Sequence, residues 1–327
     1  MANNQYNLSK EYQFDIAVTD NTYAGKLALP YVTAAVKSPD TVAKGYVRQI
    51  DGLNRKAVIS NLGISNPILA AGCDFNTDNT AAMALTEQVL TLTDLRVNEQ
   101  VCRKTIFPTW IGENMDRNGN LPGTFSDFLL ASIAAKVGES LENSMWKGSA
   151  IFGTGFQSND GTLDETGADL SACKDFFEVD LDGAISTTDI LTDLGAVYNS
   201  VVANASGMLS KPGFGFYMNQ KTYAIYAQKL AAETTYQQVG AAGTFTGLTY
   251  MGFPIYVCPG MFNDTIIATY PENLVVGTNL ATDYTEVSLI PTYQYDGSDN
   301  VRVVMNFAMG VQTAVPTDGV FATSVWT

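Results

Sequence analysis

The longest regular pattern of apolar positions lies between Thr124 and Gly148. Apolar residues recur there at every fourth position, at Phe125, Leu129, Ile133, Val137, Leu141 and Met145. This spacing predicts one buried face of a long helix. Thr124 or Ser126 is suited to cap the start of this helix, and Gly148 to end it. At about 1.5 Å per residue the helix is expected to be roughly 35 Å long.

Shorter patterns follow in the C-terminal half. A helix is predicted over 188–205, capped by Thr187 or Thr188, with its buried face formed by Ile190, Leu194, Val197 and Val201. A third helix is predicted over 220–232. Strands are expected over 213–218, 266–268 and 274–278, and a hairpin or bent strand over 249–259 around Gly252, Phe253 and Pro254. The alternation over 286–295 and 301–315 predicts an antiparallel hairpin.

The first hundred residues have a different character. Residues 1–44 carry no strong period, and Pro30 interrupts their one apolar stretch, so we expect an extended arm. Residues 45–105 favour β-structure, with strand candidates over 46–50, 56–60 and 87–103 and a loop-like stretch over 61–86. This pattern predicts a projecting hairpin with little core of its own, of the kind that packs on a partner.

Composition places the chain among ordered globular proteins. It has 327 residues, of which 46% are hydrophobic and 16% charged. No apolar run reaches the eighteen or so residues that a membrane helix needs. The polar start, MANNQYNLSK, lacks the apolar segment of a signal peptide. We therefore expect a soluble protein made inside the cell.

The net charge of −15 is distributed unevenly. Residues 1–56 contain seven Lys or Arg and five Asp or Glu, which gives +2, and the remainder contains eleven and twenty-eight, which gives −17. An excess of two positive charges is too small for a nucleic-acid-binding arm. A mildly basic end and an acidic body can instead attract each other between copies.

The numbers and positions of cysteine and histidine limit the kinds of catalytic and metal-binding site that the chain can form. Four cysteines, Cys73, Cys102, Cys173 and Cys258, stand far apart with no CxxC pair, and we expect free thiols. The chain has no histidine, which excludes Ser-His-Asp and Cys-His nucleophile systems and imidazole zinc sites. No phosphate-binding GxxxxGK[ST] motif occurs either. No catalytic residue and no cofactor is predicted, and the expectation is a protein that is not an enzyme.

One stretch has the spacing of a calcium loop. Carboxylates stand at loop positions one, three, five and twelve, with Gly183 at position six, and these are Glu178, Asp180, Asp182 and Asp189. Both ends depart from the EF-hand pattern, with Glu first and Asp last. The favoured interpretation is an acidic loop that runs into a helix, with Asp189 facing the helix dipole. These four residues remain a metal-site hypothesis.

The order of elements resembles that of the tailed-bacteriophage major capsid proteins, the Hong Kong 97 fold. Local stretches are similar as well: ENSMWKGS at 142–149, TTDILTDLGAVYNSV at 187–201, FYMNQKTYAIYAQKL at 216–230, YMGFPIYVCPGM at 250–261, ATYPENLVVGTN at 268–279 and MNFAMGVQTAVP at 305–316. The resemblance spans nearly the whole chain and depends on the ordered set, since no single motif is diagnostic.

The resemblance implies an α+β fold with four parts. Residues 1–44 would be an N-terminal arm and 45–105 an extended loop. Residues 106–186 and 287–327 would form a peripheral domain with a spine helix over 124–147, and 187–286 an axial domain. It also implies a structural protein of the virion, a subunit that self-assembles into hexamers and pentamers of an icosahedral head around double-stranded DNA, in the host bacterial cytoplasm.

The partners that the resemblance implies are other copies of the chain, a portal, and scaffold, head-completion or decoration proteins. Packaged DNA would be touched weakly and without sequence specificity, and no membrane is involved. Three alternatives stay open: an encapsulin-like compartment shell that holds cargo enzymes, a calcium-binding or carboxylate-dependent protein, and a phage tail or other virion protein.

Overall fold

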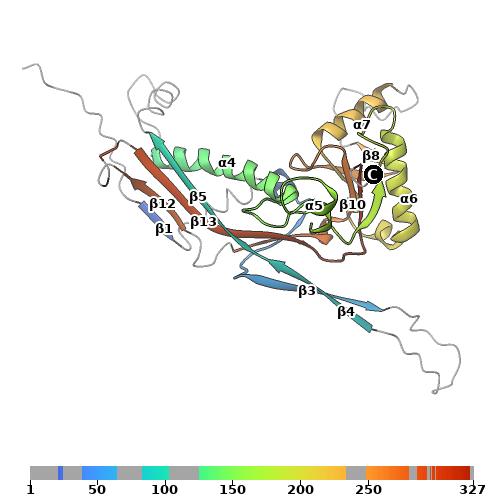
Figure 1. The fold of residues 1–327 in the computed structure, drawn as a ribbon, viewed down its shortest axis with the longest axis horizontal. Coiled ribbons are helices and arrows are strands. Elements are labelled where there is room, and N and C mark those ends of the chain that lie inside the picture. The colour runs from blue at the N-terminus through green and yellow to red at the C-terminus, as the bar shows by residue number, and fades with distance from the viewer. Residues whose placement is uncertain are drawn as a thin grey trace, which may run out of the picture.

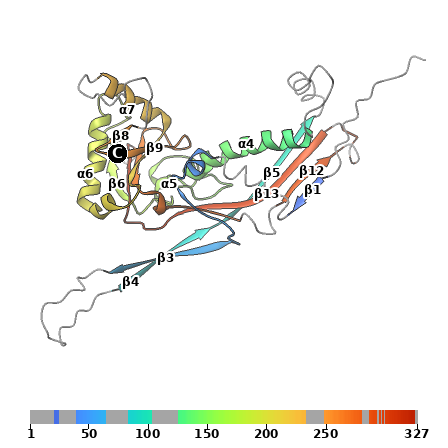
Figure 2. The ribbon, with the colours of Figure 1, turned by 180° about the vertical axis from the view of Figure 1, so that it is seen from behind.

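The molecule is elongated, with a long sheet and helix at one end and a compact α/β part at the other (Figure 1). The computed structural model describes residues 21–24, 39–64, 83–102, 125–232, 248–279, 286–292, 295, 297–298 and 300–324. Helices are interspersed among strands that pair mostly in antiparallel fashion, which confirms the predicted α+β class. A two-stranded hairpin projects away from both ends (Figures 1 and 2).

The long sheet is built around strand β13 (Asn300–Thr313). On one side β13 pairs with β5 (Thr93–Cys102). It also pairs with β12 (Glu286–Pro291) and β11 (Leu274–Thr278), all antiparallel. The strands β1 (Asn21–Ala24) and β2 (Arg48–Ile50) extend the sheet, β1 on β12 and β2 on β11. The predicted pairing of 286–295 with 301–315 is confirmed.

The second sheet forms the compact end, in the order β6-β14-β10-β7-β9-β8. Its strands are β6 (Phe177–Asp180), β7 (Gly215–Met218), β8 (Thr249–Tyr250), β9 (Phe253–Val257), β10 (Thr265–Thr269) and β14 (Val320–Thr323). Every residue of β7, β10 and β14 is buried, so both faces of the sheet are covered.

Two apolar cores meet at this second sheet. On β7, Tyr217 packs into the core under the long helix, whereas Phe216 and Met218 pack into the core under the outer helices. Successive residues of a strand point to opposite faces, so one strand joins both cores. The two ends of the molecule are therefore held together by continuous apolar packing.

The long helix α4 (Phe125–Lys147) lies along the first sheet (Figure 1). Gly148 ends it with a φ of 67°, as predicted; the predicted caps at its start lie outside the residues whose side chains are described. The buried face differs from the prediction. Leu141 and Met145 are buried, but Ile133 and Val137 are half-buried, and Leu130, Ala134 and Trp146 are buried instead. Four residues span about 40° more than one helical turn. Residues at every fourth position therefore rotate gradually away from the buried face of the helix.

Helices α6 (Ile190–Asn204) and α7 (Gln220–Ala232) cover the outer face of the second sheet. The predicted inward residues of α6, Ile190, Leu194, Val197 and Val201, are all buried. The predicted cap is wrong, because Asp189 stands at the cap position and no side chain caps the helix. The helix instead begins with the backbone bond from Ile190 N–H to the Ser186 carbonyl, 3.0 Å.

One loop prediction is corrected by the described strands, and two further stretches have local features worth noting. The 61–86 loop is too long, because β3 (Lys56–Ile64) and β4 (Met83–Thr91) extend into it from both sides. Residues 149–181, which follow the long helix, contain α5 (Glu165–Asp169) and strand β6. The bend in 249–259 is made by Met251 and Gly252, both with positive φ, before Phe253.

The remaining elements are short. They are α2 (Asp40–Ala43) and the 3-10 turns η2 (Ser206–Ser210) and η3 (Pro271–Asn273). Residues 39–47, inside the predicted arm and its junction, pack on α4 and on the second sheet. The division into 1–44, 45–105, 106–186 with 287–327, and 187–286 stays a prediction, and most of the arm lies outside the described residues.

Candidate functional site

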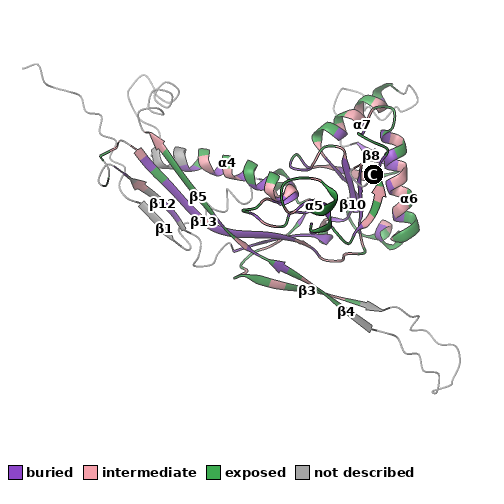
Figure 3. Cartoon of the chain, viewed as in Figure 1, coloured by how far each residue is buried: buried purple, intermediate pink, exposed green. Residues whose placement is uncertain are grey.

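The projecting hairpin of β3 and β4 is largely exposed (Figure 3), and its exposed residues include large apolar side chains. Four large apolar side chains on it are exposed: Val58 at 59%, Leu62 at 55%, Leu85 at 60% and Val89 at 49%. The strand register pairs Val58 with Val89 and Leu62 with Leu85. Directly opposed residues share a face, so the four form one strip, in which the paired Ser60 and Glu87 lie between the two apolar pairs. A solvent-exposed apolar strip of this kind marks an interaction surface.

The strip ends where the hairpin joins the long sheet. Leu90, next to Val89 on β4, points the opposite way and is fully buried, and Leu92 is 7% exposed. The chain then enters β5 at Thr93. The strand predicted over 87–103 is therefore two strands with different roles, one in the hairpin and one in the sheet.

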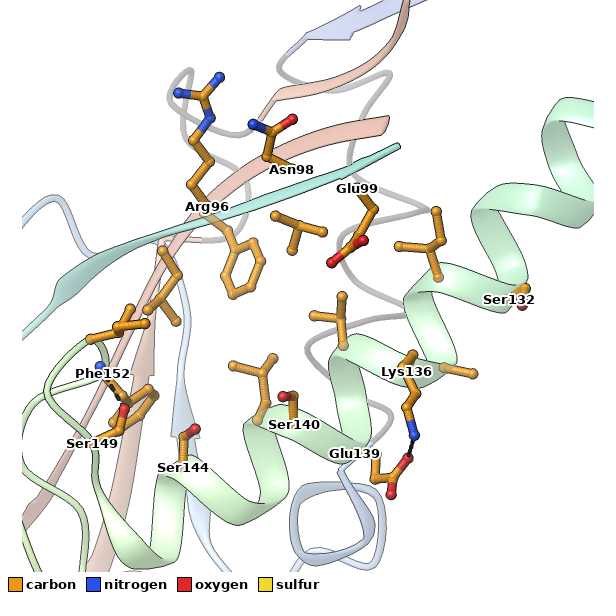
Figure 4. A pocket seen from close by; sticks show the side chains of 18 of the residues that line it. Arg96, Asn98, Glu99, Ser132, Lys136, Glu139, Ser140, Ser144, Ser149 and Phe152 are labelled. Atoms are coloured by element: carbon orange, nitrogen blue, oxygen red, sulfur yellow. Dashed lines mark hydrogen bonds and ion pairs between the residues drawn. The ribbon is translucent and has the colours of Figure 1, made fainter. Parts of the chain in front are cut away.

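A second open surface lies between α4 and β5 (Figure 4). It is a groove of about 1030 Å³. Apolar side chains from the helix and the strand line its floor, namely Ile133, Val137, Leu141, Leu95, Val97 and Val101. Charged side chains stand at its rim, with Lys136 bonded to Glu139 at 2.6 Å. Ile151, in the loop after α4, is 77% exposed beside this groove.

A buried polar cluster joins the N-terminal segment to α4. Glu142 accepts hydrogen bonds from the backbone N–H of Thr41 at 3.1 Å and from Trp146 Nε1 at 3.2 Å. The Thr41 hydroxyl also donates to this carboxylate. Burial raises the pKa of Glu142, opposed by these hydrogen bonds and one from the Gly260 backbone. Among the described residues, no cation bonds to this carboxylate. The hydrogen bonds instead hold the segment around Thr41 against helix α4.

The calcium-loop hypothesis finds no support in the geometry. Glu178 and Asp180 lie on the exposed side of strand β6, and Asp182 follows in the turn. Asp189 accepts hydrogen bonds from the Ser186 and Thr188 hydroxyls, which lower its pKa. Across the described parts of the chain, no three Asp, Glu or Cys side chains come together as metal ligands. A strand keeps the first two carboxylates extended, whereas a calcium loop must curl around its ion.

Three of the four cysteines fall within the described structure, and all three are free thiols. Cys173 and Cys258 are buried, and burial raises the pKa of both. This fits their use as small apolar residues. Cys73 lies outside the described residues. Within the described residues, no helix is long and apolar enough to cross a membrane.

Sequence reasoning identified the hairpin but not its apolar strip or the groove. The strip residues stand four apart on each strand, with Ser60 and Glu87 between them on the same face, so no simple alternation marks this face as apolar. Which face the chain itself covers depends on how the hairpin leaves the sheet. The bond from Thr41 to Glu142 joins residues 101 positions apart and has no local signal.

Comparison with known proteins gives a result only at the level of structure. No family model matches the sequence. No curated protein matches it either. Solved structures match over most of the chain. The capsid of a native GTA particle is 12% identical with a TM-score of 0.57, covering 88% of this chain and 89% of that one.

Two further structures have the same fold. Gordonia phage Cozz is 14% identical with a TM-score of 0.55, covering 87% of this chain and 86% of that one. A virus-like particle from Pyrococcus furiosus is 13% identical with a TM-score of 0.50, covering 91% and 98%. At such identities the likeness concerns the fold. The chain has the Hong Kong 97 fold, as its resemblance implied.

Proposed function

We propose that this chain is the major capsid subunit of a tailed-phage-like icosahedral head. The observation that carries the proposal is the hairpin, whose apolar strip of Val58, Leu62, Leu85 and Val89 is exposed on a single copy. The shared fold with capsid structures supports it. A two-stranded ribbon with an uncovered apolar face gains stability only when another surface covers it.

The contact between copies is heterologous in this proposal. The hairpin runs away from the α4–β5 groove of its own subunit (Figures 1 and 2), so the strip reaches such a groove only on another copy. Contacts between two different surfaces close into rings when the rotation between copies allows it. Rings of six and five copies would be the hexamers and pentamers of the head.

The same proposal assigns the four parts of the chain. Residues 1–44 are the arm, 45–105 the extended loop, 106–186 with 287–327 the peripheral domain, and 187–286 the axial domain. The head encloses double-stranded DNA, which it touches weakly, because a chain with a net charge of −15 repels phosphate. A portal and scaffold, head-completion or decoration proteins complete the virion, which assembles in the bacterial cytoplasm.

Electron microscopy of the purified protein tests the proposal. Under assembly conditions we expect closed shells built of rings of six and five. Filaments or tubes would favour a tail protein instead, and a protein that stays monomeric at all concentrations would contradict a shell subunit.

A second candidate is an encapsulin-like compartment shell. Its support is the match to the virus-like particle from Pyrococcus furiosus, which covers 98% of that chain. The material inside particles isolated from the native source separates the two. Packaged double-stranded DNA supports the phage head, and a co-purifying enzyme supports the compartment.

A further inference from the structure

The root of the hairpin crosses the long sheet at two glycines that face each other. Gly277 on β11 and Gly310 on β13 are directly paired in the strand register. Directly opposed residues of antiparallel strands project from the same face. The two missing side chains therefore open one notch in the sheet.

The hairpin root fills this notch. A Cβ atom at Gly277 would stand 2.6 Å from Leu90 Cδ2 and 2.9 Å from Leu53 Cδ1. A Cβ atom at Gly310 would overlap the backbone carbonyl oxygen of Thr91. A side chain at Gly310 would force the backbone of the root to move, whereas one at Gly277 would crowd the ends of the Leu90 and Leu53 side chains against the root.

Polar contacts fix the root beside the notch. Gln312, two residues after Gly310 on β13, donates from Nε2 to Gln88 Oε1 at 2.8 Å. The Leu53 N–H donates to the Thr278 carbonyl at 3.0 Å. The Thr278 hydroxyl bonds Asp51 Oδ1 at 2.9 Å. Strand β4 and the segment that leads into β3 are thus both tied to the long sheet.

We propose that Gly277 and Gly310 are positioning residues that set the angle at which the hairpin leaves the subunit, and through it the curvature of the shell. This rests on the proposed function. The direction of the hairpin decides where the next copy is held. In a heterologous contact, the rotation between copies decides whether and at what size the assembly closes. A small tilt at the root is magnified along the two nine-residue strands.

The test is Gly277→Ala, with Gly207→Ala as its matched control, because nothing lies within 4 Å of a Cβ atom at Gly207. We expect Gly277→Ala to keep the helix content and cooperative unfolding of the subunit. We expect its yield of particles of wild-type diameter to fall at least tenfold, as measured by electron microscopy and sedimentation. The control should assemble like the wild type.

A compensating change separates positioning from mere damage. Leu90→Val removes Cδ2, the nearest of the atoms that the methyl group introduced by Gly277→Ala would meet, so the double variant should regain part of the particles of wild-type diameter. Gly277→Ala particles with wild-type diameter and yield would overturn the proposal, as would a double variant no better than the single one.

If Gly277→Ala fails to fold, Gln312→Ala tests whether the contacts at the hairpin root set the particle diameter. It releases the root without crowding it, and a broader range of particle diameters is expected; an unchanged range contradicts the proposal. If the wild type itself forms no particles, the proposed function fails. The positioning role of Gly277 is then tested by small-angle X-ray scattering of the free subunit. Gly277→Ala should change the maximum dimension of the subunit, and an unchanged maximum dimension would overturn the proposal.

Discussion

At the scale of single residues, Glu142 stabilises one copy by joining segments that lie far apart in the sequence. It is 5% exposed and surrounded by donors from three segments of the chain. A buried carboxylate is tolerated when hydrogen bonds replace its lost hydration. Glu142 thus joins the N-terminal segment, the long helix and the turn at Gly260 in one cluster.

Glu142→Gln should destabilise the subunit by about 2 kcal/mol. The amide offers one acceptor oxygen and turns an NH₂ group towards the N–H donors of Thr41 and Trp146. Denaturant unfolding of the unassembled protein measures the loss. Glu139→Gln, at a side chain 65% exposed, is the control and should change stability by less than about 0.5 kcal/mol. Equal effects of both variants would contradict the role given to Glu142.

Asp193 predicts a dependence of stability on pH. Burial, and then the charges of Asp189 and Asp182, raise its pKa to about 6. An unfolded Asp titrates near about 3.9, so the folded state binds this proton more tightly. The contribution is favourable below about pH 4 and is lost as the pH rises through about 6.

Asp193→Asn should therefore stabilise the subunit by about 1 kcal/mol at pH 8 and by about half as much at pH 5. Chemical denaturation at the two pH values measures this difference. Asp175→Asn, at an exposed carboxylate, serves as the control and should show no such difference. A stabilisation by Asp193→Asn of the same size at both pH values would rule out titration of Asp193 as its cause.

At the scale of elements, the hairpin should matter to assembly far more than to folding. Replacing Val58 and Leu85 by Ser removes half of the exposed strip. The free subunit should change by less than about 0.5 kcal/mol per site, because neither side chain is buried there. Each apolar side chain buried by a neighbour is worth about 2 kcal/mol, so particle yield should fall at least tenfold.

Leu170→Ser is the matched control for the hairpin variant. Leu170 is 55% exposed at the end of α5, outside both the strip and the groove. Light scattering compares the assembly of the two proteins. If the hairpin variant assembled as well as the control, the strip would have no part in the contact between copies.

Elements with strong local periodicity were predictable, and those defined by distant neighbours were not. Helix α7 was predicted at its observed bounds, Gln220–Ala232, because the pattern repeats within one segment. The break between β4 and β5 at Leu92 was missed, since the alternation continues across it. The opposition of Gly277 and Gly310 follows from strand register, which single-sequence patterns do not contain.

At the scale of the whole molecule, net charge opposes the assembly of copies and apolar contact between them favours it. Each copy carries a net charge of −15, so copies repel at low ionic strength. Salt screens this repulsion, with a Debye length of about 10 Å at 0.1 M, but does not weaken apolar burial. Assembly should therefore become faster and more complete as NaCl is raised from low to about physiological concentration. Assembly that falls steadily with salt would mean that ion pairs between copies dominate.

The most direct test of the account is a cryo-electron microscopy map of the assembled protein at side-chain resolution. The account predicts a closed shell in which Val58, Leu62, Leu85 and Val89 of each copy are covered by a neighbouring copy. A shell in which these four side chains remain exposed to solvent would contradict the claim that copies complete one another through the hairpin.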